Sequence, residues 1–486
     1  MEWSKITNLG KLKESGYQSK SIREELRHNL LERLRSGQTV FEGIIGFDQT
    51  VLPDIERAVL SRHNILLLGL RGQAKTRIAR LLVELLDEYI PVVSGSELND
   101  DPLKPISRFS FDLIEEFGDE TPISWMHRSH RYVEKLATPD VSVADLIGDV
   151  DPIKAATLKL PYSDQRVIHY GLVPRSHRSI FVINELPDLQ ARIQVSLFNI
   201  LQEGDIQIRG FKLRLPLDIQ FIFTANPEDY TNRGSIITPL KDRIESQVLT
   251  HYPLTLDDAQ KITRQEANIA AEQSKNIDVP DLAFRVLERI AFHARESELI
   301  DEKSGVSARL SITAYENLVS AAERRALLGG ARKTTVRIGD LWGVIPSITG
   351  KVELVYEGEQ EGPYGVALQL IGEAVKAEFL TSFPHPDKFL KENQVDIFED
   401  IRTWFSEGNE IELLHDEADS SYGKKLQSVP GLAVLARKLA KDENEQIIAQ
   451  EVILHGLSEF NVLSKSLIDS KLTFSDMLSN MLDDLD

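Results

Sequence analysis

The eight residues from Gly69 to Thr76, GLRGQAKT, constrain the fold of this chain more than any other stretch. The apolar run NILLL precedes them, and the amphipathic run RIARLLVELL follows. A glycine-containing loop between a strand and a helix suits phosphate, because backbone N–H groups curl round it, a lysine neutralises its oxygens and a hydroxyl coordinates Mg²⁺. The segment predicts a nucleotide-phosphate site formed by Gly69, Leu70, Arg71, Gly72, Gln73, Ala74, Lys75 and Thr76.

Ala74 stands where the last glycine of such a loop usually lies. The alternative interpretation of the segment is a plain strand-to-helix turn with a surface lysine. Its position between a predicted strand and a predicted helix favours the phosphate site.

From Phe41 to about Tyr252, short β-rich runs alternate with helical ones. Such alternation predicts an α/β fold, a parallel sheet core with helices on both faces. The run GDIQIRGFKLRLPLD interrupts this order, and its period-two alternation around Arg209 and Gly210 predicts a β-hairpin. After Pro253 the periodicity is helical. We expect an N-terminal helical arm, an α/β nucleotide-binding domain, an all-α lid domain and a mainly helical C-terminal region, at residues 1–37, 38–252, 253–350 and 351–486.

The composition narrows the class of protein. The 486 residues are 42% hydrophobic and 27% charged, as in an ordinary globular protein. The formal charge of −20 opposes binding to a phosphate backbone, so we do not expect nucleic acid as a partner. Without cysteine the chain forms no disulfide and no thiolate metal site. The apolar runs are too short to cross a bilayer and the N-terminal stretch lacks a signal core, so we expect a cytoplasmic protein without membrane contact.

Two further apolar runs end in polar side chains. SIFVINE brings Asn184 and Glu185 to the end of a buried strand, and QFIFTANP brings Asn226 to the end of another. The carboxyl ends of parallel strands are where open α/β sheets bind ligands. Glu185 is the candidate general base for water attacking a γ-phosphate, and Asn184 would orient Mg²⁺ through its water shell. Asn226 is placed to bond the same water or the γ-phosphate, although Asn before Pro is more often a turn residue.

Together these motifs resemble those of the AAA+ ATPases, in the branch that holds the MoxR-type ATPases and the I subunit of magnesium chelatase. The resemblance covers roughly residues 38–345. It is carried by the loop and by ATPDVSVADLIGDVDPIKA, GLVPRSHRSIFVINELPDLQARIQVSLFNILQEG, TANPED and LKDR. It implies a P-loop AAA+ core in which Lys75 and Thr76 bind phosphate and Mg²⁺.

The resemblance also implies roles for four other residues. Glu185 would activate water, and Asn226 would be the first sensor. Arg243 in LKDR would reach the site of a neighbouring subunit, and Arg309 in VSARL would be the second sensor. Each arginine alone would be interpreted as a surface residue. Arg175 and Arg178 invite two interpretations, contact with a neighbouring subunit or plain solvent exposure.

One residue departs from the family pattern. The MoxR-type ATPases and the I subunit of magnesium chelatase normally carry Asp where this chain has Asn184. The change removes a unit charge near a divalent ion, so it would affect the affinity for Mg²⁺ and the rate of ATP hydrolysis. Because Glu185 is kept, we expect Mg²⁺-dependent ATP hydrolysis, with a nucleotide-gated scaffold of little turnover as an alternative.

The resemblance further implies a ring of identical subunits, six in this family, which remodels or activates a partner protein. A protein with a von Willebrand A domain is one candidate partner. The alternative is the motor subunit of a magnesium chelatase. The sequence does not separate these two, because the porphyrin would lie on another chain. A DNA motor is opposed by the charge of −20 and by the lack of a recognisable DNA-binding helix pair. The predicted hairpin, with Arg209, Lys212 and Arg214, would project towards the pore and partners.

Overall fold

The computed structural model describes residues 5–162, 164–203, 206–208, 211–213, 215–227, 235–388, 396–415, 417–440, 442, 445–468 and 471–477. The chain divides into two compact units, Met1–His251 and Tyr252–Asp486. Each unit is described by itself.

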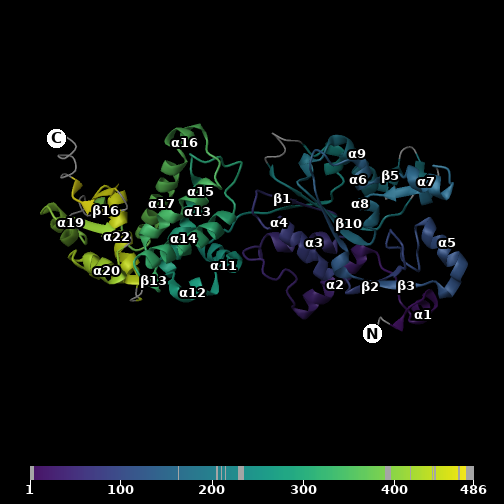
Figure 1. The fold of residues 1–486 in the computed structure, drawn as a ribbon, viewed down its shortest axis with the longest axis horizontal. Coiled ribbons are helices and arrows are strands. Elements are labelled where there is room, and N and C mark those ends of the chain that lie inside the picture. The colour runs from purple at the N-terminus through teal and green to yellow at the C-terminus, as the bar shows by residue number, and fades with distance from the viewer. Residues whose placement is uncertain are drawn as a thin grey trace. The chain divides into compact units, whose positions relative to one another are not determined.

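The first unit is built round a five-stranded parallel sheet with the order β11-β1-β10-β7-β4. Figure 1 labels β1 and β10 of this sheet. Alternate residues of β7, which lies between β10 and β4, pack on opposite faces of this sheet. Ile180 and Val182 lie in one apolar core, whereas Phe181 and Ile183 lie in another. Apolar cores on both faces explain why the strands are continuous apolar runs in the sequence. The sheet strands are β1 (Ile65–Leu68), β4 (Tyr132–Leu136), β7 (Ser179–Asn184), β10 (Ile219–Ala225) and β11 (Ser246–Leu249).

Helices supply both cores, which confirms the predicted α/β class. Leu26 of α2, Ile55 of α3 and Ile78 of α4 pack on one face. Leu146 of α6 and Leu197 of α9 pack on the other. The helices of this unit are α1 (Leu9–Glu14), α2 (Ile22–Ser36), α3 (Val51–Leu60), α4 (Lys75–Leu81), α5 (Arg108–Phe117), α6 (Val143–Leu146), α7 (Pro152–Leu158), α8 (Leu172–Arg175), α9 (Ala191–Glu203) and α10 (Thr238–Lys241).

Three antiparallel strand pairs complete this unit. They are β2 (Tyr89–Val93) with β3 (Ile123–His127), β5 (Gly148–Val150) with β6 (Ile168–Tyr170), and β8 (Ile206–Ile208) with β9 (Phe211–Leu213). The last pair is the predicted hairpin. Its expected basic residues Arg209 and Arg214 lie outside the described residues, as does Gly210.

The second unit is mainly helical and has one large apolar core. Ile290 of α13, Leu318 of α14, Leu370 of α17 and Val452 of α22 are fully buried in it. Its helices are α11 (Leu256–Glu266), α12 (Ala271–Asn276), α13 (Asp281–Glu296), α14 (Arg309–Leu328), α15 (Ile345–Thr349), α16 (Tyr356–Glu361), α17 (Pro363–Leu380), α19 (Glu399–Ser406), α20 (Asp419–Gln427), α21 (Leu432–Leu439) and α22 (Gln446–Glu459).

The second unit also contains strands that the sequence pattern did not predict. β14 (Ile411–Leu414), β16 (Lys471–Ser475) and β15 (Ser464–Ile468) form an antiparallel sheet in that order. β12 (Ile277–Asp278) and β13 (Thr334–Thr335) make a short parallel pair. Within the described part of both units, no helix is both long enough and apolar enough to cross a bilayer.

Candidate nucleotide-binding site

The predicted phosphate loop joins β1 to α4, as expected. The backbone N–H of Gly69 donates to the carbonyl of Ala225 in β10 at 3.1 Å. A Cβ added to Gly69 would lie 2.0 Å from Oγ1 of Thr250 and 2.2 Å from Oε1 of Gln73, so only glycine fits there. These two side chains are themselves joined, since Thr250 Oγ1 donates to Gln73 Oε1 at 2.7 Å. The start of the loop is thus held against both neighbouring strands, β10 and β11.

Ala74 takes the conformation of the glycine that it replaces. Its φ and ψ are 57° and 13°, in the left-handed region, directly before the first turn of α4. Gly72, two residues earlier, also has a positive φ, of 75°. A left-handed alanine costs roughly 1–2 kcal/mol, which the surrounding contacts must offset. Ala74 therefore takes a left-handed backbone conformation that a glycine would adopt without strain.

Three predicted site residues form one hydrogen-bonded chain across the sheet edge. Lys75 Nζ donates to Oδ1 of Asn226 at 2.8 Å, and Asn226 Nδ2 donates to Oε2 of Glu185 at 2.8 Å. Lys75 and Asn226 are only 7% and 6% exposed. The order of the sheet explains this meeting, because β10 lies between β1 and β7. The chain places an ammonium, an amide and a carboxylate in a row at the carboxyl ends of these strands.

Lys75 is also bonded within the loop. Its ammonium donates to the carbonyl of Leu70 at 2.9 Å and to that of Gly69. Thr76, the next residue of α4, is half-buried at the first turn of the helix. A helix N-terminus with a lysine and a hydroxyl is suited to anionic oxygens.

Glu185 lies at a sharp change of backbone direction. Its φ and ψ are 56° and 50°, and it precedes the 3₁₀ helix η6 (Leu186–Asp188). Its N–H donates to Oγ1 of Thr224 in β10 at 3.1 Å. A strained non-glycine residue held in this way is a frequent property of functional sites.

Asn184 ends β7 with both ends of its amide bonded. Oδ1 accepts a hydrogen bond from Thr224 at 3.2 Å, and Nδ2 donates to Oε1 of Glu134 in β4 at 2.5 Å. Arg80 of α4 donates to the other oxygen of Glu134 from Nε at 3.1 Å and from Nη2 at 2.9 Å. Sequence reasoning missed Glu134. The only signal was a charged residue within the short β-run YVEKL, on a strand whose pairing with β7 is not local.

The side chains present suit Mg²⁺ only in combination with a nucleotide. In the described residues, no group of three or more His, Cys, Asp or Glu could hold a metal. The oxygen donors are the hydroxyl of Thr76 and the carboxylate of Glu185, since both oxygens of Glu134 already accept hydrogen bonds. Mg²⁺ is commonly held in this way, by one or two protein oxygens together with substrate phosphates and water.

Arg243 and Arg309 are the two remaining predicted site residues. Arg243 follows α10 and contacts α9, where its Nε donates to Gln202 at 3.2 Å and its guanidinium lies 4.7 Å from the centre of the Phe198 ring. Arg309 begins α14, in the second unit, and is exposed. The roles of both residues stay predictions.

The expectation for Arg178 is wrong. Its side chain is buried, at 4% exposure, so it faces neither solvent nor a neighbouring subunit. Nη1 donates to the carbonyl of Pro91 at 2.7 Å, and the backbone φ is 61°. Arg178 is therefore a structural link between β7 and β2, whereas Arg175 is exposed.

No family model matches the chain. Several solved structures are similar to it. NtrX from Brucella abortus in complex with ADP has 15% identity and a TM-score of 0.42, over 82% of this chain and 71% of NtrX. A putative ATPase from Cytophaga hutchinsonii has 16% identity and a TM-score of 0.29, over 73% of this chain and 96% of that one. A chain in the complex between subunits BchI and BchD of magnesium chelatase has 19% identity and a TM-score of 0.34, over 66% of this chain and 98% of that one. Because these TM-scores are low, the case for nucleotide binding depends on this chain's own residues.

Proposed function

We propose that this chain is a Mg²⁺-dependent ATPase of AAA+ type. The observation that supports it best is the hydrogen-bonded row of Lys75, Asn226 and Glu185 beside a loop with phosphate-binding shape. In this proposal Lys75 exchanges its loop carbonyls for oxygens of the β- and γ-phosphates. Glu185 accepts the proton of the attacking water, and Asn226 fixes the position of the Glu185 carboxylate. Bound Mg²⁺ would neutralise charge that develops on the phosphates.

Thr76 is the proposed protein ligand of Mg²⁺. Asn184 has its amide oxygen engaged by Thr224, so its role is to hold Glu134 rather than to offer a free oxygen. Glu134 would then place a carboxylate on the neighbouring strand, with part of its charge offset by the Arg80 guanidinium. The proposal accounts for the departure at position 184 without the loss of hydrolysis.

The experiment is a steady-state ATPase assay of the full chain with three variants. Glu185→Gln is expected to bind ATP and to lose turnover by at least about 10²-fold, because the base is gone but the phosphate contacts remain. Lys75→Ala is expected to lose both binding and turnover. Arg62→Ala, an exposed arginine outside the site, is the control and should match the wild type. A wild type that binds ATP and is as inactive as Glu185→Gln would instead favour the nucleotide-gated scaffold.

We further propose that the ATPase works as a ring, a homo-hexamer in which Arg243 reaches the neighbouring site. Each predicted domain would have its own role in the ring. Residues 1–37 would form an arm, 38–252 would bind the nucleotide, 253–350 would form a lid that carries Arg309, and 351–486 would bind the partner. Sedimentation of Glu185→Gln with and without ATP and Mg²⁺ tests assembly. A monomer under both conditions would contradict the ring.

The ring would remodel or activate a partner protein, and a protein with a von Willebrand A domain is the first candidate. The second candidate, a motor subunit of magnesium chelatase, is favoured by the segment ATPDVSVADLIGDVDPIKA, which resembles that family. A pull-down with ATP-loaded Glu185→Gln separates the two. Co-purification of a large porphyrin-binding subunit would select the chelatase.

A further inference from the structure

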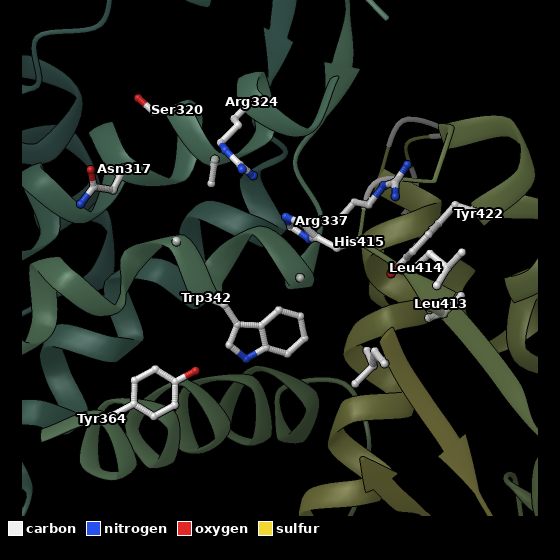
Figure 2. A pocket seen from close by; sticks show the side chains of 14 residues that line it. Asn317, Ser320, Arg324, Arg337, Trp342, Tyr364, Leu413, Leu414, His415 and Tyr422 are labelled. Carbon is white, nitrogen blue, oxygen red and sulfur yellow. The ribbon is translucent and has the colours of Figure 1, made fainter. Parts of the chain in front are cut away.

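A cavity of about 630 Å³ lies within the second unit (Figure 2). The residues that line it include members of α14, the 3₁₀ helix η8 (Ile338–Val344), α17 and the strands β14 and β16. This volume is typical of sites for small organic molecules. The cavity is separate from the phosphate loop and from β7, because both of these are in the first unit.

The ionisable side chains of known charge that line the cavity are basic. Arg324, Arg337 and His415 line the cavity, and among the described residues no Asp or Glu lines it. This is unusual in a chain with 76 acidic and 56 basic residues. Arg324 is exposed, and it makes no ion pair with any other described residue. A pocket with such walls attracts an anion.

Arg337 has hydrogen-bonding capacity that the protein leaves unused. Its side chain is 3% exposed and pairs through Nη2 with Asp419, and Nη2 also donates to the carbonyl of Glu417 at 2.8 Å. The donors Nε and Nη1 are buried and have no acceptor in the described residues. Buried charged donors without an acceptor are costly, and an anionic oxygen that reaches them through a shift of this wall would remove the cost.

Three aromatic side chains, Trp342, Tyr364 and Tyr422, also line the cavity. Tyr422 is fixed, because its hydroxyl donates to Glu451 and its ring lies 3.9 Å from the guanidinium carbon of Arg337. Trp342 and Tyr364 are less enclosed, and both rings are drawn at the cavity in Figure 2. Flat faces beside arginines suit a ligand with a planar group next to its charge.

We propose that this cavity binds a small organic anion, with a carboxylate or phosphate at Arg324 and Arg337 and a planar ring against Trp342 and Tyr364. Arginine is the residue best suited to hold such a group by paired N–H bonds. The ligand of the cavity is defined by chemistry, a ring of aromatic size bearing one anionic group.

The test is isothermal titration of the full chain carrying Lys75→Ala, so that the phosphate loop does not take up the probe. The probes are benzoate, phenyl phosphate and the neutral benzyl alcohol. We expect at least one of the two anions to bind about tenfold more tightly than benzyl alcohol, and the better anion identifies the natural headgroup. Fluorescence of wild type against Trp342→Phe gives a local readout, since the wild-type response should be lost in the variant.

Two variants make the test specific. Arg324→Gln should weaken the anion about tenfold, because it removes one charged donor and leaves the fold intact. Arg437→Gln, an exposed arginine of α21 outside the cavity, should leave binding unchanged. Equal affinity in both variants, equal affinity for benzyl alcohol, or no binding of either anion would overturn the proposal.

Discussion

Asn184 and Glu134 are joined by a hydrogen bond in which the amide nitrogen donates to the carboxylate at 2.5 Å. They lie on neighbouring parallel strands, and Leu136, two residues beyond Glu134, is the register partner of Asn184. An aspartate at position 184 would put two carboxylates in direct contact, since Oδ1 is already turned to Thr224. The asparagine is therefore matched to its neighbour and is not a random loss of charge.

This relationship predicts the effect of restoring the family residue. Asn184→Asp should lower the free energy of unfolding of the first unit by about 2 kcal/mol at neutral pH, because one of two touching carboxylates must protonate or move. Differential scanning calorimetry of the full chain measures the change.

A second substitution serves as the control for that prediction. Glu134→Gln with Asn184→Asp reverses the direction of the hydrogen bond and should regain about 1 kcal/mol or more relative to the sum of the single changes. Strict additivity of the two single variants would show that the residues are not coupled and would refute the explanation.

Asn226 links Lys75 to Glu185, and its truncation should separate binding from chemistry. Asn226→Ala removes the amide that orients the Glu185 carboxylate, so turnover should fall about 10²-fold. The dissociation constant for ATP should change less than about tenfold, because the loop and Lys75 remain. Single-turnover kinetics and nucleotide titration measure the two quantities. Asn268→Ala, at an exposed position of the second unit, is the control, and a turnover of Asn226→Ala equal to that control would count against a catalytic role.

The left-handed backbone of Ala74 leads us to expect that glycine at this position stabilises the fold. Because its φ is 57°, Ala74→Gly relieves a left-handed side chain and should raise the free energy of unfolding by roughly 0.5–1 kcal/mol. Ala79→Gly, in the right-handed part of α4, is the matched control and should lower it by about 1 kcal/mol. Thermal unfolding of both variants measures the difference. A loss of stability for Ala74→Gly would mean that the alanine methyl makes contacts worth more than the strain.

Local patterns were sufficient to predict the loop, the strands that follow it and the positions of Lys75, Glu185 and Asn226. Lys75 follows from the pattern of the loop, whereas Glu185 and Asn226 stand at the ends of apolar runs, and the ends of parallel strands meet at one edge of a sheet. Glu134 could not be found in this way, because its contact with Asn184 depends on which strands are neighbours. The burial of Arg178 depends on the distant carbonyl of Pro91, and the sheet of β14, β15 and β16 joins short strands far apart in the chain. Such features arise from tertiary pairing, which periodicity does not encode.

The buried His177 predicts how the first unit responds to acid. Burial, with a further contribution from Arg178, lowers the pKa of His177 to about 4, while Asp100 and Asp101 act in the opposite direction. Its Nδ1 accepts the N–H of Asp218 at 3.0 Å, so the folded state requires the neutral ring. The contribution of the neutral His177 ring to the free energy of unfolding is therefore complete above the pKa of about 6.5 that His177 has in the unfolded chain. This contribution is lost as the pH falls towards 4.

The expected loss over that interval is on the order of 3 kcal/mol. His177→Asn keeps an acceptor near the position of Nδ1 but does not titrate, so its stability should vary less between pH 6.5 and 4. The quantity to measure is the difference between wild type and variant in calorimetry at several pH values, because the raised pKa of the buried Asp218 acts in the opposite direction in both proteins. Parallel curves for the two proteins would show that protonation of His177 does not limit the stability of this unit in acid.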